Sequence, residues 1–277
     1  MALLAGTVQP PLLTLLSSTS SPSLSPLFVT HTDPSSSSSL ITTLQDSIPS
    51  SDTDQNIIPR NDSKGSVAHN VVHIQSPNIA DTYIQAGCSL TESRRRLAKG
   101  KGGEDLPLAL GVELPWVGMQ VKRLGRRHMS FEIGFVDTRG REGVVRCSSF
   151  KKSPTVHPYR DPPLIHLPLT LPHISPSQLT PWLHISLDLL SLIPLFPSLP
   201  RPQKHAPDDD HDNDDSAARK RRKVAELPSG SFGSVTYVRV YANCRVRRIW
   251  FSAEGEKTIE TMGRSVKEEW GLYAAET

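Results

Sequence analysis

The stretch VRVYANCRVRRIWFS, residues 238–252, decides the fold of this chain. Apolar and polar residues alternate along it with a period of two, which places the apolar side chains on one face of a β-strand. Arg248 interrupts this alternation because it falls on the apolar side, just before Ile249. A bulge or a turn near Asn243 resolves the interruption. The stretch therefore predicts extended structure with an irregularity near its centre.

The same period of two recurs upstream. It is visible in residues 117–121, 129–136 and 183–189. Asp137–Gly140 has the composition of a tight turn, so residues 144–147 can return as the hairpin partner of the preceding strand. Many short strands separated by turns rich in Pro and Gly are typical of an antiparallel sandwich or barrel.

Composition agrees with an all-β fold. The chain has 277 residues, 24 of them Pro, and a Pro in a helix interior costs about 3 kcal/mol. We therefore predict a single helix, over residues 258–270. Cys88, Cys147 and Cys244 lie far apart, which argues against a disulfide framework or a zinc module. The net charge of +3 is too small to indicate a nucleic-acid partner by itself.

Four stretches differ in composition from these strands. Residues 17–54 are rich in Ser, Thr and Pro, residues 94–103 are basic and contain glycines, and thirteen of the prolines fall within residues 154–207. Residues 201–223 hold a run of aspartates followed by a basic run. Such stretches bury too little apolar surface to offset the entropy of the chain. We expect all four to be tails or inserts around the folded core.

The basic run in the last of these stretches is a candidate nuclear-localisation signal. A dense cluster of Lys and Arg is what a nuclear import receptor binds. The alternative is an insert in which the acidic and basic blocks neutralise each other. The candidate residues are Arg219, Lys220, Arg221, Arg222 and Lys223.

An arginine-rich strand face is the candidate partner-binding site. Arg239, Arg245 and Arg247 fall on one side of the alternation, with tyrosines among them. Aligned Arg and Tyr side chains can bind an acidic protein surface or a phosphate backbone. The alternative is a sheet face on which each arginine pairs with a carboxylate of a neighbouring strand. The candidate residues are Arg239, Tyr241, Arg245, Arg247 and Arg248.

No motif predicts catalysis, a cofactor or a metal. Residues 230–235, GSFGSV, are similar to the end of a kinase glycine-rich loop, but Pro228 replaces the first glycine of that pattern and no other kinase motif follows. We expect a flexible lead-in to a strand there. The ten histidines lack metal-ligand spacing, and no two carboxylates form a pair suited to acid–base chemistry. No stretch reaches the ~18 apolar residues of a membrane span, so no membrane partner is predicted.

Residues 238–252 also resemble a known family. The sequence Val-Arg-Val-Tyr-Ala-Asn-Cys-Arg, followed by a basic pair, an aromatic residue and Phe-Ser, is similar to the signature strand pair of the cilia- and flagella-associated protein 20 family. Further segments resemble this family in the same order along the chain. They are residues 12–28, 110–115, 121–137, 144–158 and 183–190. The insert of residues 200–230 falls where the family has a short connection.

This resemblance implies a jelly-roll-like antiparallel β-sandwich without a catalytic site. It implies a protein of the cytoplasm or cytoskeleton, found at the cilium if the organism has one, that acts on axonemes, basal bodies and tubulin modification. The implied partner is tubulin in microtubules or another acidic protein surface. The alternative is a nuclear accessory factor in transcription, imported through residues 219–223, with RNA or DNA as a candidate partner.

A third hypothesis is a sandwich that binds a sugar or another small ligand, since function depends on the site rather than the fold. Trp116, Trp182 and Trp250 are the aromatic residues that would stack on sugar rings. The alternative role for each of them is packing in the core. Exposed indole rings would favour the sugar-binding hypothesis, and buried ones would favour packing.

We therefore predict an all-β protein, an antiparallel β-sandwich with disordered inserts. N-terminal strands within residues 1–30 pack on the core, and residues 31–66 form a Ser/Pro-rich mobile segment. Residues 67–199 and 231–277 build the sandwich. Residues 200–230 form a disordered acidic and basic insert between them.

Overall fold

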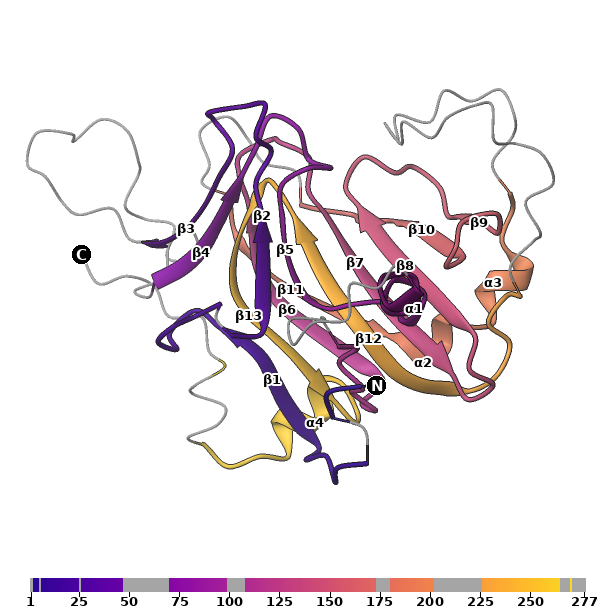
Figure 1. The fold of residues 1–277 in the computed structure, drawn as a ribbon. Coiled ribbons are helices and arrows are strands. Elements are labelled where there is room, and N and C mark those ends of the chain that lie inside the picture. The colour runs from indigo at the N-terminus through magenta and orange to yellow at the C-terminus, as the bar shows by residue number, and fades with distance from the viewer. Residues whose placement is uncertain are drawn as a thin grey trace, which may run out of the picture.

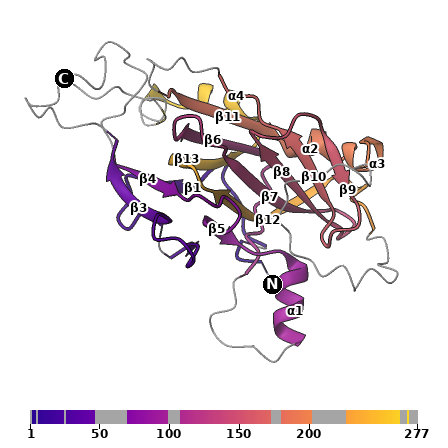
Figure 2. The same cartoon turned by 90° about the horizontal axis from the view of Figure 1, so that it is seen from above.

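The computed structural model describes residues 2–4, 6–24, 26–46, 70–98, 108–172, 180–201, 226–264 and 270. In these residues the strands form two sheets that pack face to face, and α1 (Leu90–Ala98) lies on the outer side of one of them (Figures 1 and 2). The predicted β-sandwich is thus confirmed.

The first sheet has six strands in the order β11–β6–β13–β4–β3, with β1 also paired to β13. All its neighbours are antiparallel. β13 is the centre of this sheet, because it pairs with β6 along its length, with β4 near its beginning and with β1 near its end. The strands are β1 (Leu12–Ser17), β3 (Leu40–Gln45), β4 (Asn70–Gln75), β6 (Trp116–Arg123), β11 (Trp182–Asp188) and β13 (Cys244–Ser252).

The second sheet has seven strands in the order β2–β5–β12–β7–β8–β10–β9. β10 and β8 are parallel, and the other pairs are antiparallel. The strands are β2 (Phe28–His31), β5 (Tyr83–Gly87), β7 (Ser130–Asp137), β8 (Glu142–Ser148), β9 (Thr155–His157), β10 (Leu164–Pro168) and β12 (Phe232–Tyr241).

Residues 238–252 belong to both sheets. β12 ends at Tyr241 in the seven-stranded sheet and β13 begins at Cys244 in the six-stranded sheet, so the chain crosses between the sheets at Ala242–Asn243. A register shift between Val246 and Arg248 places a β-bulge in β13 opposite β6. The predicted turn near Asn243 is therefore present, and the additional bulge is what turns Arg248 away from the core.

The core lies between the inner faces of the two sheets. Phe131 of β7 contributes to it from one sheet, and Met119 of β6 and Phe251 of β13 contribute from the other. Burying each such side chain stabilises the fold by about 1.5–3 kcal/mol. Two short helices, α2 (Leu189–Leu192) and α3 (Leu195–Ser198), follow β11, and Phe196 of α3 packs edge to face on Phe135 of β7 at 5.7 Å.

Two segments expected outside the core are regular elements. Residues 40–45, within the segment predicted to be mobile, form β3, because their backbone pairs with β4 over six residues. Residues 94–98, predicted as part of a loop, are the second half of α1. The carboxylate of Glu142 accepts hydrogen bonds from the amides of Leu90 at 2.5 Å and Thr91 at 2.8 Å, and these bonds cap the helix.

The Pro-rich stretch was also wrongly predicted as an insert. Residues 154–207 contain β9, β10, β11, α2 and α3, and their prolines lie mostly at or beyond the ends of these elements. Within the helix predicted over residues 258–270, the described residues are helical in α4, which spans Glu256–Glu260, and again at Arg264 and Trp270. Gly263 lies between α4 and Arg264 and is not helical, and glycine is a poor helix former.

The insert predicted over residues 200–230 lies largely outside the described residues, at 202–225. Its last residues are held on the sandwich, since the amides of Ser229 and Gly230 donate to Oδ2 of Asp137 at 3.0 and 2.9 Å. The expected flexible lead-in at residues 230–235 is also short, because β12 already begins at Phe232.

Gly118 of β6 faces the indole of Trp250 on β13. A Cβ atom at Gly118 would lie 2.1 Å from Cε2 of Trp250, well inside van der Waals contact. We expect Gly118→Ala to displace the indole and to lower the free energy of unfolding by about 1–3 kcal/mol. Gly263→Ala is the control, since a Cβ there meets no heavy atom within 4 Å. Urea unfolding followed by tryptophan fluorescence measures both, and equal midpoints would contradict the prediction.

Candidate functional site

The predicted arginine face does not exist as one surface. Arg239 and Tyr241 lie on β12 in the seven-stranded sheet, whereas Arg245, Arg247 and Arg248 lie on β13 in the six-stranded sheet. The crossing at Ala242–Asn243 separates them, so the two groups lie on opposite outer faces of the sandwich. The prediction failed because it treated both strands as one continuous strand.

On the seven-stranded sheet, the strand register aligns a row of polar side chains. Gln85, Arg239, Glu132, Arg146 and His166 stand opposite one another on neighbouring strands from β5 to β10. Glu132 is the centre of the row, with a side chain only 3% exposed, and binds Arg146 at 2.5 Å and Arg239 at 3.5 Å. Nε of Arg239 also donates to Gln85 at 2.7 Å. Arg239 is therefore held by its own sheet.

Three tyrosine rings surround the guanidinium group of Arg239. Its Cζ atom lies 4.6 Å from the ring centre of Tyr83, 5.6 Å from that of Tyr237 and 5.8 Å from that of Tyr241. Arg239 donates to the hydroxyl of Tyr241 at 3.1 Å. Burial, together with the nearby charge of Glu132, raises the pKa of Tyr241 to about 12, so its hydroxyl group stays neutral.

The six-stranded sheet also pairs two of its cations with one buried carboxylate. Asp46, at the end of β3, has a fully buried side chain that binds Arg245 at 2.5 Å and Lys122 at 3.4 Å. It also accepts a hydrogen bond from Nε1 of Trp182 at 2.9 Å. Nε of Arg245 donates to Nδ1 of His73 at 3.3 Å. Each outer face thus has one buried carboxylate between two cations. Arg239 and Arg245 therefore follow the alternative considered for the arginine-rich strand, in which each arginine pairs with a carboxylate instead of a partner protein.

Arg247 and Arg248 are buried, with 3% and 2% of their surface exposed. Arg247 donates to Oε1 of Gln120 at 2.5 Å, and the guanidinium of Arg248 stacks 4.1 Å from the ring centre of Trp270. The prediction that these two residues lie on an open partner-binding face is therefore wrong. Their side chains join strands to the C-terminal part of the chain.

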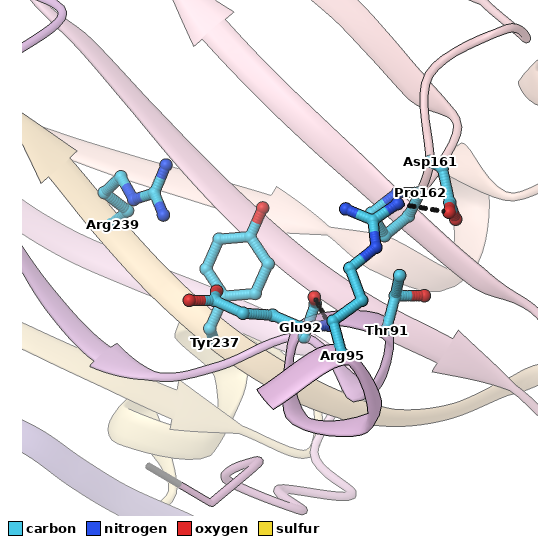
Figure 3. Close-up of a pocket in the computed structure, with 8 residues that line it drawn as sticks. Thr91, Glu92, Arg95, Asp161, Pro162, Tyr237 and Arg239 are labelled. Atoms are coloured by element: carbon cyan, nitrogen blue, oxygen red, sulfur yellow. Dashed lines mark hydrogen bonds and ion pairs between the residues drawn. The ribbon is translucent and has the colours of Figure 1, made fainter. Parts of the chain in front are cut away.

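A pocket lies between α1 and the outer face of the seven-stranded sheet, with a volume of about 350 Å³. Figure 3 shows the ion pair of Arg95 and Asp161, 2.7 Å apart, at one end and Arg239 at the other. The lining contains two carboxylates and two guanidinium groups, so its net charge favours neither an anion nor a cation. The lining residues are Ser89, Thr91, Glu92, Arg95, Asp161, Pro162, Tyr237 and Arg239.

Sequence reasoning missed a cluster of exposed cations, here called the basic end. It consists of residues 123–129, which connect β6 to β7, and residues 149–154, which follow β8. The two segments are joined because Met129 and Ser149 bond twice, N–H to Oγ and N–H to carbonyl, each at 3.0 Å. Both segments carry cations and no carboxylate, which was readable from RLGRRHM and SFKKSP. Only the fold brings the two motifs together.

Two of the three tryptophans considered for sugar stacking are buried, and Trp116 is half-buried. Trp182 and Trp250 are buried, and Trp250 lies against Gly118 and edge to face with His184 at 4.9 Å. This arrangement supports the packing role over stacking on sugar rings. The described residues contain no group of His, Cys, Asp and Glu side chains suited to a metal ion, and none of their helices has the length and apolarity to cross a bilayer. The basic run Arg219–Lys223 lies outside the described residues.

Two face-packed sheets with ion pairs on their outer faces define a β-sandwich protein. Residues 55–195 match the family model of the CFA20 domain, which covers just over half of the chain, so the chain belongs to this family. The family is associated with cilia and is generally non-enzymatic. No curated protein matches the chain. The family match ends before β12 and β13, the strands on which the resemblance in the sequence is most specific.

Glu132 is expected to make stability depend on pH. Burial opposes its ionisation, but the guanidinium groups of Arg146 and Arg239 lower its pKa below the ordinary value of 4.5. A carboxyl group with a lowered pKa stabilises the fold above its unfolded pKa, and this stabilisation is lost as the pH falls through the folded value. Glu132→Gln should remove that pH dependence and, at neutral pH, cost about 3 kcal/mol, because it removes the buried negative charge that both guanidinium groups contact.

The measurement is urea unfolding of both proteins from neutral pH down to about pH 3. Glu113→Gln is the control, because Glu113 is an exposed residue in the connection before β6. Its stability should follow that of the unaltered protein at every pH. If the free energy of unfolding of Glu132→Gln declines with falling pH as steeply as that of the unaltered protein, Glu132 is not the source of the dependence.

Proposed function

We propose that this protein is a structural component of the cilium that binds the acidic surface of tubulin in microtubules. The observation that carries the proposal is membership of the cilia-associated CFA20 domain family over residues 55–195. The finer role, in axoneme assembly and tubulin modification at the cytoskeleton, follows the resemblance of residues 238–252. Such a protein acts by occupying a site on its partner, so it needs a stable surface rather than reacting groups.

The arrangement of charge supports this role. The buried carboxylates Glu132 and Asp46 each pair with two cations of their own sheet, which holds these cations within the outer faces. Arg126, Arg127 and Lys152 remain exposed on connections between strands, where they can meet an acidic surface with little reorganisation. Electrostatic complementarity of this kind raises association rates and specificity.

Co-sedimentation with microtubules tests the proposal. We expect the full chain to pellet with microtubules at low ionic strength and to be released as salt is added, since exposed charges are screened beyond about 10 Å at 0.1 M salt. Bovine albumin serves as a control for trapping in the pellet. A full chain that stays in the supernatant at every salt concentration would contradict tubulin binding, and a tagged chain absent from cilia of a ciliated cell would contradict the ciliary location.

A further inference from the structure

The basic end presents cations at one end of the sandwich. Arg126, Arg127 and Lys152 are exposed, the first two on the β6–β7 connection and the third after β8. The contact of His128 with Phe150, edge to face at 5.7 Å, adds to the backbone bonds that join the two segments. Three cations from two distant parts of the sequence therefore share one small surface.

Among the described residues, no carboxylate pairs with Arg126, Arg127 or Lys152, and Arg127 donates to Oδ1 of Asn243 at 3.5 Å. Asp46, the buried carboxylate of the adjoining sheet, is already engaged by Arg245 and Lys122. Burial and the nearby charge of Arg126 lower the pKa of Arg123, which lies at the end of β6. Cations that disfavour one another's charge create a positive potential, and an anionic partner relieves it.

We propose that the basic end is a docking surface for an acidic polypeptide segment, one rich in Glu or Asp. This inference rests on the proposed function, because it names the part of the chain that meets the acidic partner. Arg126 and Arg127 supply planar groups that pair with carboxylates, and Lys152 supplies a point charge.

The aromatic side chains at the basic end favour a polypeptide over a nucleic acid. Proteins that bind single strands combine a basic groove with aromatic rings that stack on successive bases. At the basic end, the ring of Phe150 is occupied on two sides, since it packs edge to face against His128 and against His166, each at 5.7 Å. The surface therefore offers charge without a stacking platform.

Charge reversal of the full chain tests the docking surface. The test variant is Arg126→Glu, Arg127→Glu and Lys152→Glu together, and the matched control is Arg94→Glu, Arg139→Glu and Lys257→Glu together. All six residues are exposed, and the two variants change the net charge equally. The control residues lie on α1, on the β7–β8 turn and on α4, away from the basic end.

The probe is a fluorescent oligoglutamate peptide, measured by anisotropy at low salt. We expect the test variant to bind it at least about tenfold more weakly than the control variant, because rim charges act mainly through association. Equal binding by the two variants overturns the docking surface. Single-stranded RNA of equal charge is measured beside it, and a loss confined to RNA also overturns the proposal. Thermal unfolding checks both folds, and Arg126→Ala with Lys152→Ala replaces the test variant if its midpoint falls.

Microtubule pelleting of the same proteins separates the two proposals. If the unaltered chain and both variants pellet equally, the docking surface is overturned and the proposed function stands. If the unaltered chain does not pellet but binds oligoglutamate through the basic end, the proposed function is overturned and the docking surface stands.

Discussion

The sandwich depends on the crossing of the chain between its two sheets at Asn243. The side-chain Oδ1 of this buried residue accepts a hydrogen bond from the amide of Ser76 at 2.9 Å, and its carbonyl accepts one from the amide of Leu124 at 3.1 Å. The amide of Ala242 donates to the carbonyl of Thr82 at 2.9 Å. An unpaired buried amide costs about 1–3 kcal/mol. The crossing therefore ties the β4–β5 and β6–β7 connections to the β12–β13 turn.

This crossing explains where the charges of the protein lie. It sends Arg239 to one outer face and Arg245 to the other, where Glu132 and Asp46 pair with them. A buried pair contributes little net stability, but removing one partner is costly, so these arginines are bound to their own sheets. Arg126 lies on a connection, where no neighbouring strand places a carboxylate opposite it, and its side chain is exposed. The same strand topology thus accounts for the ion pairs on the two outer faces and for the exposed arginine on the connection between β6 and β7.

Much of the fold could be predicted from local pattern. The alternation in residues 129–136 and 183–189 corresponds to β7 and β11, and Asp137–Gly140 is the turn before β8. β3 was missed because its sequence LITTLQ lies within a Ser-, Thr- and Pro-rich stretch, and its backbone is fixed by pairing with the distant strand β4. α1 was missed although its start carries a local signal, since the hydroxyl of Ser89 accepts from the amide of Glu92 at 3.0 Å within the sequence Ser-Leu-Thr-Glu. The second cap, the carboxylate of Glu142 on β8, comes from a distant strand.

By itself, the sequence determined the period of two, the irregularity near Asn243, the resemblance to a ciliary family and the presence of cations in RLGRRHM and SFKKSP. Only the tertiary structure decided which of the cations of the chain are exposed and which are buried. An alternating pattern states which side of a strand a residue is on, but it does not state which sheet the strand joins or what covers that side. Both depend on pairing between strands that are distant in the sequence. In this protein that pairing buries Arg247 and Arg248 and leaves Arg126 and Arg127 exposed.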